Sequence, residues 1–149
     1  MRLKYLISLA ILIVAAAGIY WYFHQKTTGA IGPGIITGTV IYPSEIIPPQ
    51  QVCAESMQTK KTICVDVEMA ENQPDFSLVV PPGDYYVFAQ LRQPVGDFTS
   101  RYRAYFNEFV RCGIQVDCNE ALHQQYIPVH VESGSTVTEI QPHDWYAPL

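Results

Sequence analysis

Hydrophobic and polar residues alternate along much of the chain beyond residue 34, with the period of two that is typical of β-strands. Pro, Gly, Asn and Asp residues stand between most of the alternating stretches, as in the segments YPSEIIPPQ, AENQPD, PPGD and ESGS. The pattern predicts seven short strands, at residues 35–42, 50–57, 62–68, 76–80, 85–91, 126–132 and 136–141. Strands of this length and spacing indicate a mainly β fold, a β-sandwich.

One stretch has the period of a helix instead. In residues 100–110, SRYRAYFNEFV, the side chains of Tyr102, Tyr105, Phe106 and Phe109 recur at spacings of three and four. We therefore expect one short helix here, packed against the sandwich.

The N-terminal part of the chain contains a long uncharged run. Residues 5–23 hold no charged side chain, and at about 1.5 Å per residue a helix of this length spans roughly 28 Å, close to the thickness of a bilayer's hydrocarbon core. The aromatic residues at 20–23 end the run as a belt at a membrane interface does. We predict a signal anchor, an uncleaved transmembrane helix, at residues 1–26, a linker at residues 27–34 and the sandwich domain at residues 35–149.

The orientation of this segment follows from Arg2 and Lys4, which favour a cytoplasmic N-terminus by the positive-inside rule. A single helix then holds the domain on the extracytoplasmic side, periplasmic or extracellular. A cleaved signal peptide, with secretion of the domain, is the second interpretation, because the alanines at 15–17 provide small residues for a cleavage site.

All four cysteines lie in the part of the chain that this topology exports, where thiols are oxidised to disulfides. If Cys53 faces Cys64 in an antiparallel hairpin, paired residue numbers add up to 117 and every aliphatic side chain of the two strands falls on one face. The cysteines then bridge the strands on the opposite, solvent side. Cys112 and Cys118 form the second predicted pair. Neither spacing fits the cysteine knuckles of zinc sites, so no metal site is predicted.

Residues 76–89 carry the most specific motif of the chain. It reads F-x-L-x-V-P-P-G-x-Y-x-V-x-A and is formed by Phe76, Leu78, Val80, Pro81, Pro82, Gly83, Tyr85, Val87 and Ala89. Together with ITGTVIYP before it and YIPVHVESGSTVTEI after it, the motif resembles the carboxypeptidase regulatory-like domain. The resemblance implies a transthyretin-like (prealbumin-like) Greek-key sandwich of seven strands, and a docking or binding module. In the tight Pro-Pro-Gly-Asp turn, Gly83 is free to take a positive φ.

The sequence lacks the catalytic motifs of enzymes with this architecture. No His is followed three residues later by Glu, the zinc-binding pair of carboxypeptidases that carry such a domain, and HDWYAPL stands where the transthyretin-like hydrolase of urate breakdown has Tyr-Arg-Gly-Ser. His143 and Asp144 suggest a catalytic pair, but no GxSxG elbow accompanies them. We predict no catalytic residue and no cofactor. A small enzyme with an unrecognised site, and calcium binding by the acidic turn at 66–75, stay open.

The predicted domain is acidic. Arg2, Lys4 and Lys26 precede it. The domain therefore contains the other six basic residues and all 14 acidic residues, which gives it a formal net charge of −8. A nucleic-acid surface needs a basic stripe, and the sequence has none.

Aromatic and arginine side chains crowd the segment from Arg92 to Cys118, which we call the insert because it is an addition to the domain that the chain resembles. These residue types are enriched at binding hot spots. The candidate partner-binding residues are Arg92, Phe98, Arg101, Tyr102, Arg103, Tyr105, Phe106 and Phe109. The alternative is that the aromatic side chains belong to the core or pack a helix.

The functional prediction is a non-catalytic module, anchored in the membrane by residues 5–23, that contacts another envelope protein or assembles an envelope complex. A carbohydrate-binding module that uses the insert is the alternative, because exposed aromatic rings also stack on sugars. An exposed apolar patch favours the first function, and a concave groove with flanking polar groups favours the second.

The membrane anchor is tested by the fate of the N-terminus. Because residues 5–23 are expected to stay in the bilayer, the mature protein should remain with membranes after a carbonate wash and should begin at Met1 or Arg2. A mature N-terminus at Gly18 in N-terminal sequencing would show instead that the segment is a cleaved signal peptide.

Overall fold

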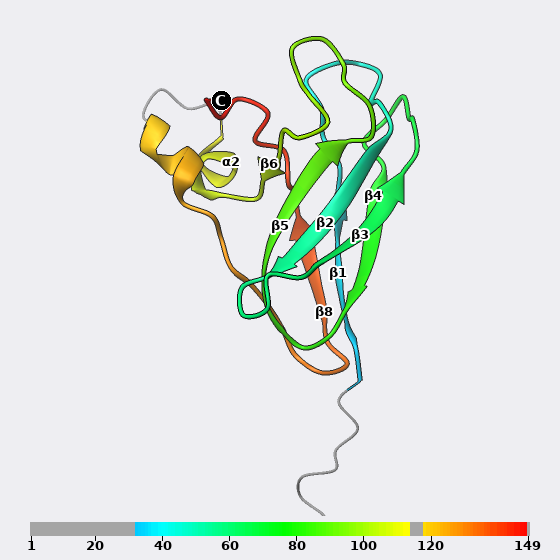
Figure 1. The fold of residues 1–149 in the computed structure, drawn as a ribbon, viewed down its shortest axis with the longest axis vertical. Coiled ribbons are helices and arrows are strands. Elements are labelled where there is room, and N and C mark those ends of the chain that lie inside the picture. The colour runs from blue at the N-terminus through cyan, green and yellow to red at the C-terminus, as the bar shows by residue number, and fades with distance from the viewer. Residues whose placement is uncertain (1–31, 114–117, 149) are drawn as a thin grey trace, which may run out of the picture. The chain divides into compact units, whose positions relative to one another are not determined.

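The computed structural model describes residues 32–113 and 118–148 (Figure 1). The predicted anchor at residues 5–23 lies outside these ranges. Within them, no helix combines the length and the apolar character needed to cross a membrane.

Two β-sheets form the framework of the described chain, as the alternating pattern predicted. Their strands are β1 (Gly34–Thr39), β2 (Gln50–Ser56), β3 (Thr62–Val67), β4 (Asp75–Val80), β5 (Gly83–Leu91), β6 (Ala104–Tyr105), β7 (Val129–Val131) and β8 (Thr136–Ile140). One sheet has the order β4-β1-β8, with β8 parallel to β1, and the other has the order β3-β2-β5-β6, with β7 also paired to β5. The predicted strand at 126–132 is shorter than expected, because only Val129–Val131 pair with β5.

The hairpin of β2 and β3 has the predicted register. Cys53 lies opposite Cys64, and the pairing extends from Gln50 opposite Val67 to Glu55 opposite Thr62. Both predicted disulfides are confirmed: Cys53–Cys64 joins Cα atoms 4.1 Å apart, and Cys112–Cys118 joins Cα atoms 6.0 Å apart.

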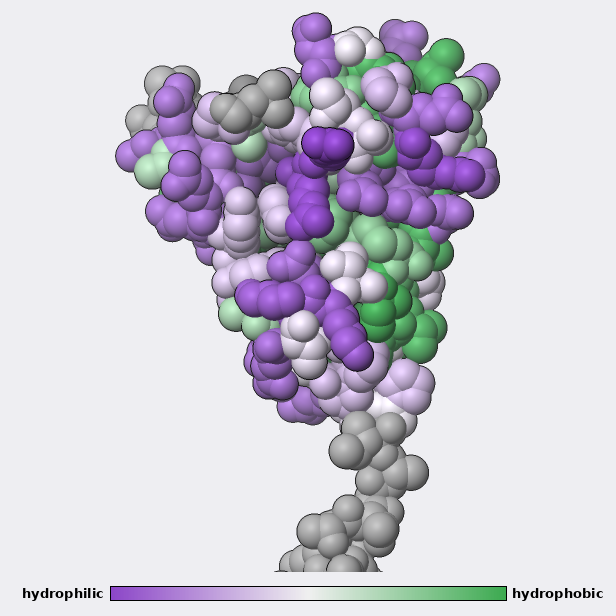
Figure 2. Space-filling model, in the orientation of Figure 1, coloured by the Kyte–Doolittle hydropathy of each residue, from purple (hydrophilic) through white to green (hydrophobic). Residues whose placement is uncertain are grey.

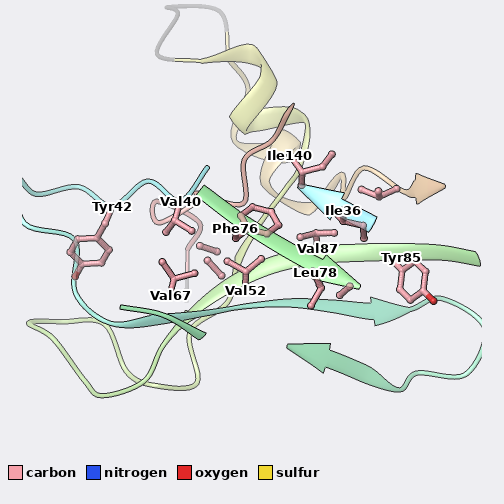
Figure 3. Packing of buried hydrophobic residues seen from close by; sticks show 14 of the residues in the cluster. Ile36, Val40, Tyr42, Val52, Val67, Phe76, Leu78, Tyr85, Val87 and Ile140 are labelled. Carbon is pink, nitrogen blue, oxygen red and sulfur yellow. The ribbon is translucent and has the colours of Figure 1, made fainter. Parts of the chain in front are cut away.

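The hydrophobic core lies between the two sheets. Side chains from both sheets point toward one another in it, with Tyr42 near one end and Tyr85 near the other (Figure 3). Ile36, Val52 and Val87 are each 0% exposed. Full burial of an aliphatic side chain of this kind contributes about 1.5–3 kcal/mol, so this core is the main source of stability.

The cysteine bridge does not lie on a solvent face at both of its ends, which corrects the sequence prediction. Cys64 is exposed, but Cys53 is 0% exposed. Cys53 pairs with Phe88 of β5, which is itself 1% exposed and lies opposite Tyr105 of β6. The outer face of the five-stranded sheet is therefore covered by part of the insert, which a two-strand pattern could not show.

The turn between β4 and β5 agrees with its predicted geometry. Gly83 has a φ of 155°, and the Tyr85 hydroxyl donates a hydrogen bond of 2.6 Å to the Pro81 carbonyl. This bond ties the side chain at one end of the core to the turn beside it.

The predicted helix at 100–110 is wrong for most of its length. The short helix α2 spans Glu108–Cys112, and a 3₁₀ helix, η1, spans Glu120–Gln124. Residues 104–105 form β6 instead, because they pair with the free side of β5. The Asn107 side chain accepts a hydrogen bond of 3.1 Å from the Val110 amide and so starts α2 after this pairing has ended.

The contact between β1 and β8 leaves no space for a side chain at Gly38. A Cβ atom built there falls on the backbone of Ile140, at the point where the β1–β8 register shifts. Gly38→Ala should therefore lower the free energy of unfolding by about 3 kcal/mol or more, the upper part of the range for overpacking. Thermal and urea unfolding measure this change.

Gly32→Ala is the matched control, since its Cβ would meet only Ser133 Oγ at 3.7 Å, an ordinary contact. If Gly38→Ala unfolds at the same urea concentration as Gly32→Ala, the β1–β8 packing described here does not hold.

Candidate functional site

The eight candidate residues of the insert do not form one surface. Phe98 and Tyr102 join Tyr42 and Trp145 in a group of packed rings, which we call the core-end cluster. Tyr102 stacks on Trp145 with ring centroids 5.7 Å apart and is only 7% exposed. For these two residues the structure supports the alternative interpretation, in which the aromatic side chains of the insert belong to the core.

The Tyr102 hydroxyl donates hydrogen bonds to residues 144–147, which we call the C-terminal segment. It donates to the Ala147 carbonyl at 2.9 Å and, at 3.2 Å, to the Asp144 carbonyl. Burial, together with the negative charge of Asp144, raises the pKa of Tyr102 to about 12. The hydroxyl therefore stays protonated across the physiological range and acts as a structural donor.

Arg103 and Tyr105 cover the outer face of their own sheet. The Arg103 guanidinium lies 4.4 Å from the centroid of the Phe88 ring, forms an ion pair of 3.0 Å with Glu55 and donates to the Tyr105 hydroxyl at 3.3 Å. The hydrogen bond to Tyr105 is the largest cause of the raised pKa of Arg103. Tyr105 stacks on Tyr126, with ring centroids 4.0 Å apart. We call Glu55, Phe88, Arg103, Tyr105 and Tyr126 the outer-face cluster; most of the polar groups and rings in it already contact one another.

The four remaining candidates are scattered. Arg92 pairs with Glu68 at 2.9 Å, and Arg101 is exposed. Phe106 packs against the core, and Phe109 stacks on His123 with ring centroids 3.7 Å apart. Only Arg92 of the eight lines the groove described next.

A groove of about 570 Å³ lies among three loops at one end of the sheets. We call it the loop groove; its walls come from residues between 42 and 49, from residues 68–69 and from residues 92–95. The cyan and yellow-green loops lie together at this end in Figure 1, where Figure 2 shows hydrophobic surface among hydrophilic side chains.

Backbone contacts fix the loops around this groove. The Arg92 amide donates to the Pro49 carbonyl at 3.1 Å, and Ile47 forms a β-bridge with Ala70. Ile46, Met69 and Val95, on three different loops, are 57%, 64% and 39% exposed. The groove thus presents three apolar side chains to solvent from loops that are tied to one another. Nothing in the sequence singled out Ile46 and Met69, because the apolar residues of these loops follow neither a strand nor a helix period.

A group of three polar side chains, Asn107, His123 and Asp144, is buried near the C-terminus. Asp144 is 1% exposed, and its Oδ2 lies 2.7 Å from His123 Nδ1 and accepts a hydrogen bond from Asn107 Nδ2. The sequence suggested His143 as the partner of Asp144, but the His143 ring contacts the Gln141 carbonyl instead, at 3.0 Å. Neighbouring positions along an extended segment point in different directions, so adjacency in sequence was misleading.

The buried polar arrangement lacks a nucleophile in the part of the chain that the structure describes. No Ser or Thr hydroxyl there bonds to His123, and both described disulfides occupy their cysteines. Across residues 32–113 and 118–148, no group of three or more His, Cys, Asp or Glu side chains is placed to hold a metal ion.

The chain matches no family model, no curated protein and no solved structure in the three comparisons. The resemblance to the carboxypeptidase regulatory-like domain stays a prediction from the sequence.

Because Tyr102 is buried, its loss should destabilise the domain. Tyr102→Ala removes a stacked ring and a buried hydroxyl and should lower the free energy of unfolding by about 3–5 kcal/mol. The neighbouring Arg101→Ala removes an exposed side chain and should change it by less than about 0.5 kcal/mol. Urea unfolding of the two variants checks this, and equal midpoints would mean that Tyr102 is a surface residue after all.

Proposed function

We propose that the domain is a non-catalytic protein-binding module that contacts its partner through the loop groove. One observation carries the proposal. In the described residues, six large hydrophobic side chains are exposed, and three of them, Ile46, Met69 and Val95, gather around this groove. Exposed apolar side chains are ordinary when scattered, but a gathering of this kind is typical of an interaction surface.

The surroundings of these side chains support the proposal. The ion pair of Arg92 with Glu68 lies in the wall of the groove and supplies the polar rim that protein interfaces have around an apolar centre. Pro48, Pro49 and Pro94 also line it, and their fixed φ angles limit the conformational entropy that the loops lose on binding.

β1 begins at Gly34 and runs toward the loop that contains Ile46, so the groove lies at the far end of this strand. We propose the finer architecture expected from the sequence as well: a transthyretin-like Greek-key sandwich, anchored by residues 5–23 on the extracytoplasmic side, whose partner is another envelope protein.

A carbohydrate-binding module is the second candidate. It is favoured by Tyr126, which is 38% exposed and stacks on Tyr105, whose hydroxyl accepts a hydrogen bond from Arg103. One face of Tyr126 is taken by Tyr105, however, and the edge-to-face contact with Tyr86 takes more of its surface. Little of the Tyr126 ring is therefore left for a sugar, whereas the loop groove exposes three apolar side chains.

Photo-crosslinking in cells tests the proposed function. A photoreactive phenylalanine analogue at Val95 should crosslink the full-length protein to one discrete partner protein, whereas the same analogue at Val79 should not. Val79 is the matched control because it is 55% exposed and lies on β4, away from the groove.

A charged side chain introduced into the loop groove should then abolish the crosslink from Val95 to the partner. Ile46→Glu is expected to weaken the partner's affinity at least tenfold, about 1.4 kcal/mol, while Val79→Glu leaves it unchanged. The proposal fails if the crosslink forms equally from Val79, or if Ile46→Glu folds normally and keeps the crosslink. A crosslink from Tyr126 to a glycan would favour the second candidate.

A further inference from the structure

The strand β3 has one side to which no other strand bonds. It forms an edge of the five-stranded sheet and, in the described residues, pairs only with β2 (Figure 1). At the next step of the β2–β3 register, the Ser56 amide donates to the Lys61 carbonyl at 2.9 Å, so alternate residues from Lys61 onward bond to β2. The backbone amides and carbonyls of Thr62, Cys64 and Asp66 therefore point away from the sheet.

Two further observations describe this free edge. The Cα atoms of Cys53 and Cys64 are 4.1 Å apart, close to the spacing of residues in an antiparallel ladder that do not bond to each other. Ile63 and Val65 pack against the core but are only partly buried, because the described chain places no strand beyond them. Unpaired backbone groups beside half-covered apolar side chains are a template for a further strand.

The charges around β3 indicate which strand this is. Lys60 and Lys61, the two lysines of the described residues, precede the strand, and Asp66 and Glu68 stand at its other end. An antiparallel copy of β3 brings the lysines of each chain beside the carboxylates of the other. Lysines within an edge strand often prevent such pairing, but these two lie before the residues that would pair. The edge is thus complementary in charge to itself.

The other strands with a free side lack this property. β6 and β7 are only two and three residues long. β8 is interrupted by its shift of register against β1 and by Glu139, whose φ is 62°. β4 is as long as β3, but the charged residues around it, Glu71, Asp75 and Asp84, are all acidic. An antiparallel copy of β4 would therefore meet no opposite charge.

We propose that the domain forms a symmetric dimer in which β3 pairs with β3 of a second copy, antiparallel. Cys64 lies opposite the same residue of the other chain, Thr62 opposite Asp66, and Ile63 opposite Val65, so each contact occurs twice, as in any twofold interface. This register joins the free amides and carbonyls to one another. Backbone hydrogen bonds supply the affinity, and the charges fix the register and direction. The dimer does not depend on the function proposed for the loop groove.

Hydrogen exchange measured by NMR on the full-length protein in detergent tests the dimer. The comparison is with Lys60→Glu/Lys61→Glu, which places like charges together at both ends of the interface. At about 1 mM protein, where mass action populates even a weak dimer, the amides of Thr62, Cys64 and Asp66 should exchange at least about tenfold more slowly in the wild type than in this variant.

Two controls accompany this comparison. Arg101→Glu/Arg111→Glu makes the same change of net charge at exposed arginines of the insert and should keep the wild-type protection. The Ser77 amide is the internal control. Because the Val40 amide donates to the Pro74 carbonyl in the β1–β4 register, Ser77 points its amide to the free side of β4, and this amide should exchange equally in all variants.

A mixture of two variants assigns the protection to a second copy. Isotope-labelled Lys60→Glu/Lys61→Glu should regain it when unlabelled Asp66→Lys is added, because opposite charges then meet at both ends of the interface. Asp66 is exposed, so its replacement should spare the fold. The proposal is overturned if the three amides exchange as fast as that of Ser77 in the wild type, if the charge reversal leaves them protected, or if the mixture does not restore protection.

Discussion

The stacking of Trp145 on Tyr102 closes the end of the core at which the loop groove lies. β1 ends at Thr39 and β5 at Leu91. At this end of the core the rings of Tyr42, Phe98, Tyr102 and Trp145 pack together, with pairs of centroids between 5.0 and 5.9 Å apart. Each such pair contributes about 0.5–1.5 kcal/mol beyond the area it buries, so the cluster is a substantial part of the domain's stability.

Hydrogen bonds fix the orientation of the side chains in and around the core-end cluster. The Trp145 indole donates to the Ile41 carbonyl at 2.8 Å, the Tyr102 hydroxyl donates to the C-terminal segment, and the Asp144 carboxylate bonds to Asn107 and His123. Residues from three separate stretches of the chain, at 41, 102–107 and 123, are thereby tied to residues 144–147. Tyr42 also lines the loop groove, so this groove shares a wall with the core.

The sequence predicted what depends on local alternation and missed what depends on distant contacts. The register of β2 and β3 followed from sorting their side chains, because a shift by one residue would expose every aliphatic group. The burial of Cys53 did not follow, since it depends on a third strand, in which Phe88 lies opposite Cys53. The helical spacing of Tyr102 and Tyr105 was outweighed by pairing with β5, and the segment alternates instead: Tyr102 and Ala104 are buried, whereas Arg103 is exposed. The bond between His123 and Asp144 joins two segments that no motif connects.

Hydrogen exchange of the Trp145 indole proton in the full-length protein tests most directly whether the C-terminal segment closes the core. If it does, the bond to the Ile41 carbonyl opens only when the domain unfolds, and the indole proton exchanges with the same free energy of opening as the amides of the central strand β2. Exchange through a local opening that costs several kcal/mol less than global unfolding would contradict the account, because the core-end cluster would then be a surface cover on a core complete without it.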